Sequence, residues 1–186
     1  MNDYKFHVDT ALNELTLALS AVDEKQTELL IQEILGAEKV FFVGVGRVFL
    51  SLQSIAKRFA HLGINAHLVG EICEPAITDK DLLIVASGSG ESLVPCTIAK
   101  KAKTFGAKIV MIGSNPKSTL SQIADLLVRV PTNTKLNLSD EIKSNQIMTS
   151  LFEQFLLLYG DILSSMIAKQ KHLDLKTLWH LHANLE

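Results

Sequence analysis

The chain has 186 residues, a formal net charge of −2 and 47% hydrophobic residues, which is typical of a compact folded protein and excludes a disordered or fibrous one. The near-neutral net charge does not indicate the excess of basic residues that is typical of nucleic-acid-binding proteins. Two cysteines, Cys73 and Cys96, are too few for a disulfide framework or a four-ligand zinc site, so we expect reduced thiols in a cytoplasmic protein. Because the first ten residues are polar, we expect no signal peptide, and the longest apolar run, residues 155–159, is too short for a membrane span.

The first 36 residues predict two helices. Apolar residues of the first helix recur at spacings of three and four; they are Tyr4, Val8, Leu12, Leu15 and Leu19. Asp23 is the candidate N-cap of the second helix, which we expect to end at Gly36. The buried stripe of this second helix is expected to hold Leu29, Leu30, Ile34 and Leu35.

Short apolar runs and helical stretches alternate in the middle of the chain. The runs predict strands that are buried on both faces; they cover residues 39–43, 66–69, 82–86, 108–112 and 126–130. The helical stretches cover residues 48–62, 92–105 and 118–124, and a long helix over 144–169 and an amphipathic piece over 174–185 follow. This alternation predicts a parallel sheet with right-handed crossovers.

We therefore expect one α/β domain over residues 1–186, a three-layer α-β-α sandwich with a five-stranded parallel sheet. Its parts are leading helices in 1–36, a sheet core in 37–131 and C-terminal helices in 140–186. Ligands of such sheets bind beyond the carboxyl ends of the strands. Three loops leave strand ends here, at residues 44–47, 70–75 and 87–92.

The loop Ser87-Gly88-Ser89-Gly90-Glu91-Ser92 carries the most chemistry. Its glycines allow close backbone approach, its serines supply hydroxyl groups, and it opens into a helix whose N-terminus favours an anion. These features suit a phosphate monoester, and the alternative is a turn that only caps the helix.

The first loop, with Gly44, Gly46 and Arg47, is a weaker signal. Phe49 stands where a dinucleotide fingerprint needs Gly or Ala, and the chain has no P-loop lysine motif. Arg47 can offer a planar fork to a phosphate or hydroxyl, or it can be a surface arginine at a helix start.

Read in order, these loops resemble the SIS (sugar isomerase) domain family, and within it the 6-phospho-3-hexuloisomerases. The matching segments are 44–47, 61–63, 69–71, 74–77, 81–92, 100–110, 150–154 and 182–186. The segments Ser-Leu-Phe-Glu-Gln at 150–154 and His-Ala-Asn-Leu-Glu at 182–186 narrow the resemblance to the hexuloisomerases. Val48 and Phe49 depart from the Ser and Gly that are usual in the family. The resemblance implies a flavodoxin-like sheet and a phosphorylated sugar as substrate.

The reaction that the resemblance implies interconverts D-arabino-hex-3-ulose 6-phosphate and D-fructose 6-phosphate through an enediol, without a metal or other cofactor. It also implies that the first loop and all six residues of the serine loop, 87–92, bind substrate. Glu153 is the candidate base, and its Phe and Leu neighbours can desolvate the carboxylate. Periodicity alone would make Glu153 a helix-surface carboxylate paired with a lysine.

His182 is the candidate second catalytic group, because a histidine can shuttle protons at neutral pH. In related isomerases the corresponding histidine reaches a neighbouring subunit's site, which implies a homo-oligomer, a dimer or tetramer with shared sites. His61 and Glu71 are secondary candidates that fall inside matching segments. We expect Trp179 to pack the last helix on a partner.

Two other functions stay open. One is an aldose–ketose isomerase that acts on a five- or seven-carbon phosphosugar, because Val48 and Phe49 change the first loop. The other is a non-catalytic phosphosugar-binding protein that acts as a sensor. The presence of both Glu153 and His182 favours an enzyme. We expect no nucleic-acid or membrane partner.

Overall fold

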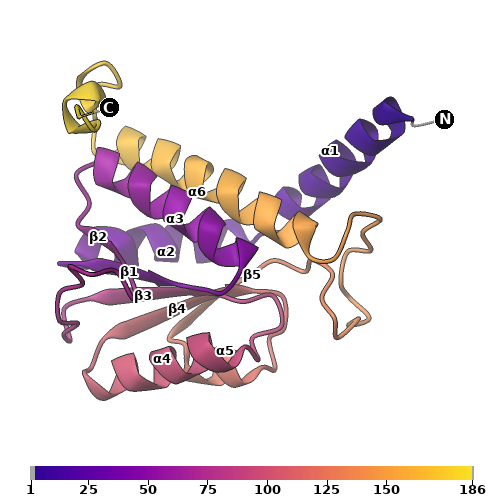
Figure 1. Ribbon diagram of the computed structural model, residues 1–186, viewed down its shortest axis with the longest axis horizontal. Helices are drawn as coiled ribbons and strands as arrows, with labels where there is room; N and C mark the ends of the chain where they lie inside the picture. Colours follow the sequence, from indigo (N-terminus) through magenta and orange to yellow (C-terminus); the bar gives the residue numbers. More distant parts are fainter. Residues whose placement is uncertain (1–2, 186) are drawn as a thin grey trace.

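The computed structural model describes residues 3–185 and contains a five-stranded parallel sheet with helices on both faces (Figure 1). In chain order the elements are α1 (Tyr4–Ser20), α2 (Glu24–Gly36), β1 (Val40–Val43), α3 (Arg47–His61), β2 (Ala66–Leu68), β3 (Leu82–Ala86), α4 (Leu93–Thr104), β4 (Lys108–Gly113), α5 (Thr119–Ile123), β5 (Leu126–Arg129), α6 (Ser150–Gln170) and the 3-10 helix η1 (Thr177–Leu181). The predicted three-layer α/β fold is confirmed.

The order of the strands in the sheet is β2-β1-β3-β4-β5. All neighbouring strands are parallel, with Val40 opposite Leu82 and Leu82 opposite Lys108. The chain passes from β1 outward to β2 and then returns beyond β1 to β3, so the direction of strand addition reverses between β1 and β3. Such a switch point leaves a crevice at the carboxyl ends of the two strands. We call the edge at which all five strands end the carboxyl edge, and the opposite one the amino edge.

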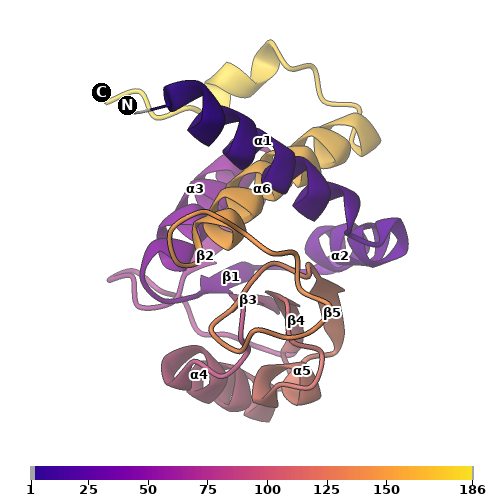
Figure 2. The ribbon, with the colours of Figure 1, turned by 90° about the vertical axis from the view of Figure 1, so that its right-hand side faces the viewer.

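Alternate strand residues supply two separate hydrophobic clusters. Val40 and Phe42 of β1 face the cluster that contains side chains of α2, α3 and α6. Phe41 and Val43 face the other cluster, which is completed by α4 and α5. Burial on both faces explains why the strands are apolar runs without alternation. The end-on view in Figure 2 shows α4 and α5 below the sheet and α2, α3 and α6 above it.

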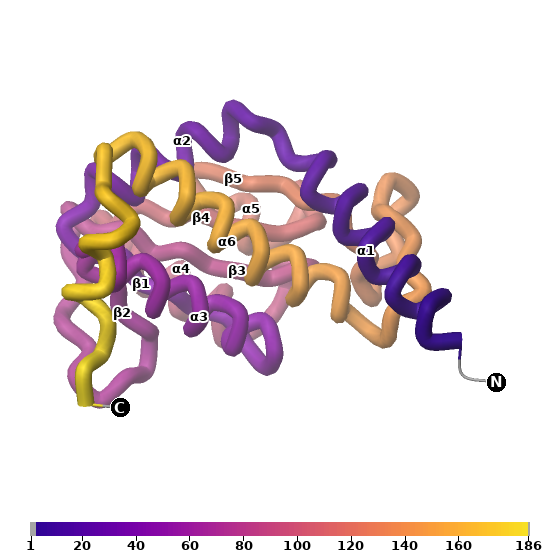
Figure 3. Tube along the Cα trace, turned by 90° about the horizontal axis from the view of Figure 1, so that it is seen from above, coloured from indigo at the N-terminus to yellow at the C-terminus, as the bar shows by residue number. Residues whose placement is uncertain are grey.

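Helices α3 and α6 lie side by side and run in the same direction, from the carboxyl edge to the amino edge (Figure 3). Gly160 permits this contact, because a Cβ there would lie 2.3 Å from Cγ1 of Ile55. By length and composition alone α6 could cross a membrane, but 61% of its most apolar stretch is buried inside the molecule. That burial is typical of the core helix of a soluble protein.

The leading helices have their predicted ends, but part of their predicted burial is wrong. The Asp23 carboxylate caps α2 by accepting from the Lys25 N–H at 2.8 Å, and α2 ends at Gly36 as expected. Leu29 is 48% exposed, because the buried face of α2 is turned toward Leu30, Ile31 and Ile34. In α1 the outer apolar residues Tyr4 and Leu12 are also exposed.

The predicted C-terminal helices are shorter than expected. Residues 144–149 are irregular, and α6 begins only at Ser150. Met148 has a positive φ of 53°, which helical residues do not adopt. The predicted amphipathic helix over 174–185 is reduced to the short 3-10 helix η1, none of whose residues is buried.

Candidate active site

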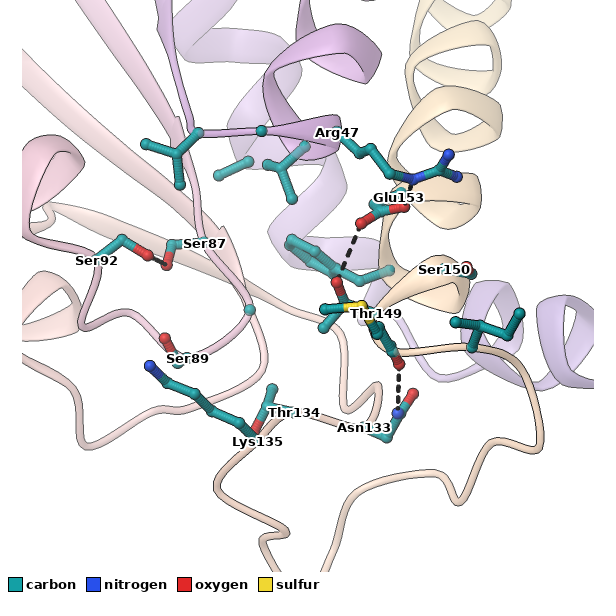
Figure 4. A pocket seen from close by; sticks show the side chains of 18 of the residues that line it. Arg47, Ser87, Ser89, Ser92, Asn133, Thr134, Lys135, Thr149, Ser150 and Glu153 are labelled. Carbon is teal, nitrogen blue, oxygen red and sulfur yellow. Dashed lines mark hydrogen bonds and ion pairs between the residues drawn. The ribbon is translucent and has the colours of Figure 1, made fainter.

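A pocket of about 950 Å³ opens at the carboxyl edge, at the switch point between β1 and β3 (Figure 4). This volume is within the range of small-molecule sites. Four segments form its walls: the loop after β1, the serine loop after β3, the loop after β5, and the segment that leads into α6 (residues 144–149), which we call the strap. The lining residues are Val45, Gly46, Arg47, Val48, Ala86, Ser87, Gly88, Ser89, Ser92, Asn133, Thr134, Lys135, Gln146, Ile147, Met148, Thr149, Ser150, Phe152 and Glu153.

Glu153 is a buried carboxylate in the first turn of α6, only 8% exposed. Its Oε2 accepts from Nε of Arg47, and its Oε1 accepts from the Thr149 hydroxyl at 3.0 Å. Ser51 donates to the backbone oxygen of Glu153 at 2.9 Å and so fixes the start of α6 against α3. Glu153 is therefore paired with an arginine at the pocket rather than with a lysine on an exposed helix face.

The serine loop turns tightly on its own hydroxyl groups. The Ser87 Oγ accepts from the Gly90 N–H at 3.1 Å and lies 3.3 Å from the Ser92 Oγ, and both serines line the pocket with Ser89. Ser92 is the N-cap residue of α4, yet its side chain makes no capping hydrogen bond. Its hydroxyl is thus not committed to capping the helix N-terminus, the end that attracts an anion.

Three expected site residues lie behind the lining. Gly44 packs under α3, where a Cβ would lie 3.0 Å from Cδ1 of Leu52. Gly90 has a φ of +68°, and a Cβ there would lie 2.1 Å from the Ser118 Oγ. Glu91 turns away to α5, where its two carboxylate oxygens accept from the N–H and hydroxyl of Thr119, both at 2.7 Å. None of these three residues is among those that line the pocket.

The loop after β5 belongs to the pocket and was missed in the sequence. Its run Asn133-Thr134-Lys135 follows a strand end, so the rule that selected the other three loops would also have found it. Figure 4 shows Lys135 extending toward Ser89 and Asn133 donating to the Met148 backbone oxygen, a contact of 3.1 Å. Residues 146–149 were missed because they were expected to be helical.

His182, His61 and Glu71 lie outside this pocket. His182 stacks on His61 with ring centroids 5.2 Å apart, at the end of α3 opposite to Arg47. Oε1 of Glu71 lies at hydrogen-bond distance, 2.8 Å, from Nδ1 of His67 in β2. Glu186, the last residue of the matching terminal segment, lies outside the described residues. Within residues 3–185, no three His, Cys, Asp or Glu side chains are grouped to hold a metal ion.

The pocket therefore combines a buried carboxylate, two cations and a hydroxyl-rich loop at a helix N-terminus. The carboxylate can take a proton from a carbon acid, and the arginine beside it can stabilise an oxyanion. Lys135 and the serine loop can hold a phosphate. These groups suit the isomerisation of a phosphorylated compound.

Known proteins share both the sequence and the fold. A family model described as SIS domain matches residues 33–158. A Bacillus subtilis (strain 168) protein named 3-hexulose-6-phosphate isomerase is 38% identical over 97% of each chain. A Mycobacterium gastri protein of the same name is 34% identical over 100% of this chain and 92% of that one. A Methanococcus jannaschii protein, whose crystal structure infers a molecular function of 3-hexulose-6-phosphate isomerase, has a TM-score of 0.84 at 29% identity and covers 97% of this chain and 99% of that one. The chain belongs to the SIS domain family.

Proposed function

We propose that this protein is a cytoplasmic isomerase that interconverts D-arabino-hex-3-ulose 6-phosphate and D-fructose 6-phosphate. The observation that carries the proposal is the buried Glu153 carboxylate, held by Arg47 and Thr149 at the wall of a pocket rich in hydroxyl groups. The full-length similarity to the Bacillus subtilis isomerase supports the same reaction.

The phosphate binds at the serine loop. Ser87, Ser89 and Ser92 line this side of the pocket, and the N-terminus of the 12-residue helix α4 adds its partial positive charge. Lys135 extends toward Ser89 from the opposite loop and supplies a full charge (Figure 4). This placement directs the sugar carbons toward Arg47 and Glu153.

Glu153 acts as the base. It takes the proton from C2 of the 3-ketose, the C2–C3 bond becomes a double bond, and the carbonyl electrons pass to O3, which is protonated from water to give the 2,3-enediol. Glu153 then returns its proton to C3, while O2 loses its proton to water and becomes the carbonyl oxygen of the 2-ketose. Arg47 faces the negative charge that develops on the sugar oxygens. The Glu153 carboxylate uses two of its four lone-pair positions to accept from Arg47 and Thr149, so two remain that can take the proton from the sugar carbon.

We also propose that the protein is a homo-oligomer in which His182 serves the site of a neighbouring subunit. In its own subunit His182 is separated from Arg47 by the length of α3, roughly 20 Å at the rise of an α-helix. Leu12 and Leu17 of α1 are more than half exposed, and Trp179 of η1 is 73% exposed. Contact with a second copy would cover such apolar side chains.

A coupled assay tests the reaction. A synthase generates the 3-hexulose 6-phosphate in place from formaldehyde and ribulose 5-phosphate, and the appearance of fructose 6-phosphate is followed. We expect turnover by the wild type and none above background with Glu153→Gln. If the wild type shows no turnover while fructose 6-phosphate still raises its melting temperature, the protein binds a phosphosugar but the proposed reaction is wrong.

A further inference from the structure

Glu14 is a buried carboxylate on α1, far in sequence from every residue of the pocket. It is 6% exposed, whereas α1 otherwise buries only Ala18 completely. Its Oε1 accepts from the Asn145 N–H at 2.7 Å. Its Oε2 accepts from the Ser144 hydroxyl at 2.6 Å and from Nε2 of Gln146 at 3.0 Å. One side chain of the leading helix thus holds three consecutive residues of the strap.

The strap continues from these contacts into the pocket. Gln146, the last residue held by Glu14, itself lines the pocket and accepts from Nε2 of Gln154 on α6 at 2.8 Å. Ile147, Met148 and Thr149 follow as wall residues. Glu14 is therefore connected to the site by a short series of hydrogen bonds.

The hydrogen bonds at this position favour an ionised carboxylate. Burial acts to raise the pKa of Glu14, but the hydrogen bonds from Asn145, Ser144 and Gln146 outweigh it and hold the pKa below its usual value. All three partners are donors, so a glutamine would turn its own NH₂ donor toward at least one of them. Residues 144–149 have no regular secondary structure of their own, so tertiary bonds such as these hold the first half of the strap in place.

We propose that Glu14 is a positioning residue: it fixes residues 144–146 and, through them, the 147–149 wall of the pocket in the geometry that binds substrate. The effect of Glu14 on substrate binding and turnover rests on the proposed function. Its structural part, the ordering of the strap by α1, concerns the ligand-free protein.

Hydrogen exchange on the ligand-free protein tests the structural part. In Glu14→Gln the amides of 144–149 should exchange about 10-fold faster, since the Asn145 N–H loses its acceptor or gains a competing donor. Leu15→Ala is the matched control, because Leu15 lies next in α1, packs on the same core and makes no bond to the strap. Its strap should exchange as in the wild type after correction for the loss of global stability.

Kinetics test the consequence. In the coupled assay Glu14→Gln should lower kcat/KM about 10-fold, mostly through a higher KM, because displaced wall residues weaken substrate contacts. Leu15→Ala should keep wild-type constants at a temperature where both variants are folded. Ser144→Ala should show a smaller loss that does not add to that of Glu14→Gln in the double variant, since both act through one network.

The outcomes separate the two proposals. Unchanged exchange in the strap of Glu14→Gln would overturn the inference, and so would an equal kinetic loss in Leu15→Ala. Faster exchange without any change in KM or in fructose 6-phosphate affinity would also overturn it. If the wild type itself shows no turnover, the proposed function fails, and the affinity of Glu14→Gln for fructose 6-phosphate, measured by calorimetry, decides the inference instead.

Discussion

The two edges of the sheet place their polar groups in opposite ways. At the carboxyl edge Arg47, Lys135 and the serine loop line an open pocket around Glu153. At the amino edge the carboxylate of Asp81, which is 1% exposed, accepts from the N–H and hydroxyl of Thr78 at 2.7 and 2.8 Å and pairs with Lys39 at 3.1 Å. At the amino edge Thr78 and Lys39 bind the Asp81 carboxylate itself, whereas the polar groups at the carboxyl edge surround an open pocket. We infer that the amino edge serves stability and the carboxyl edge serves binding.

The parallel helices α3 and α6 connect the two edges. They begin at the pocket with Arg47 and Glu153 and end at the amino edge, where His61 meets His182. The two residues expected to do chemistry therefore lie at opposite ends of one subunit. Under the proposed function, a second copy of the chain brings its His182 to the Glu153 of the first.

The largest expected effect is that of Glu153→Gln at the carboxyl edge. Removing the base should lower kcat by roughly 1,000-fold while fructose 6-phosphate still raises the melting temperature. Asp161→Asn is the control on the same helix, because Asp161 is half exposed and pairs only with Arg58 across the outer surface. Equal losses in steady-state kcat for the two variants would contradict the role of Glu153.

Subunit mixing tests the separation of the two chemical groups. His182→Ala should lower kcat by about 100-fold, the scale of a proton-transfer group. When it is mixed with Glu153→Gln and the subunits are exchanged, hybrid dimers carry one intact site, and about one quarter of wild-type activity should return. Activity that stays at the level of the unmixed variants would show that His182 serves no neighbouring site.

Lys135→Met tests where the phosphate binds in the pocket. Loss of the charge beside the serine loop should raise KM about 10-fold and leave kcat nearly unchanged, because the phosphate contact is equal in the ground and transition states. Lys143→Met removes a charge from the same loop region outside the pocket lining and should keep the wild-type KM. A wild-type KM in Lys135→Met would place the phosphate elsewhere.

Asp81→Asn should have the smallest effect on activity and a clear effect on stability. Burial acts to raise the pKa of Asp81, but the hydrogen bonds from Thr78 and Lys39 outweigh it and hold the pKa below its usual value. Such a group stabilises the folded state above its unfolded pKa, near 3.9, and this stability is lost as the pH falls through the folded value.

The free energy of unfolding of Asp81→Asn should therefore be about 2 kcal/mol lower than that of the wild type at pH 7. The difference between the two proteins should shrink below about pH 4. Urea unfolding across this pH range measures it. A difference that persists unchanged at low pH would mean that the charge of Asp81 is not its source. Its kcat and KM at pH 7 should match the wild type.

The sheet and its helices were predictable because their signals are local. Buried strands such as β3 are continuous apolar runs, and the Asp23 cap and Gly36 mark the ends of α2. The start of α6 was not predictable from periodicity, because residues 144–146, just before it, bind a tertiary partner, Glu14, 130 residues away along the chain. The exposure of Leu29 likewise depends on how α2 is turned against the sheet.

The candidate site was predictable in part for the same reason. The loops after β1 and β3 follow strand ends and bring Arg47 and the serines to the pocket. Within the serine loop, Gly90 and Glu91 were expected to bind substrate, but neither lines the pocket, and the Glu91 carboxylate accepts from Thr119 instead. Such roles depend on tertiary neighbours, which a local pattern does not contain.

Hydrogen exchange into fructose 6-phosphate tests the claim that Glu153 is the base of a 3-hexulose 6-phosphate isomerase. The wild type is incubated with fructose 6-phosphate in D₂O, and the sugar is followed by proton NMR. With the wild type we expect deuterium at C3, because Glu153 removes the C3 proton of fructose 6-phosphate in the reverse reaction. With Glu153→Gln we expect no deuterium in the sugar. Deuterium at C1 instead would identify an aldose–ketose isomerase, and no incorporation in a protein that binds the sugar would identify a non-catalytic binding protein; either result would contradict the claim.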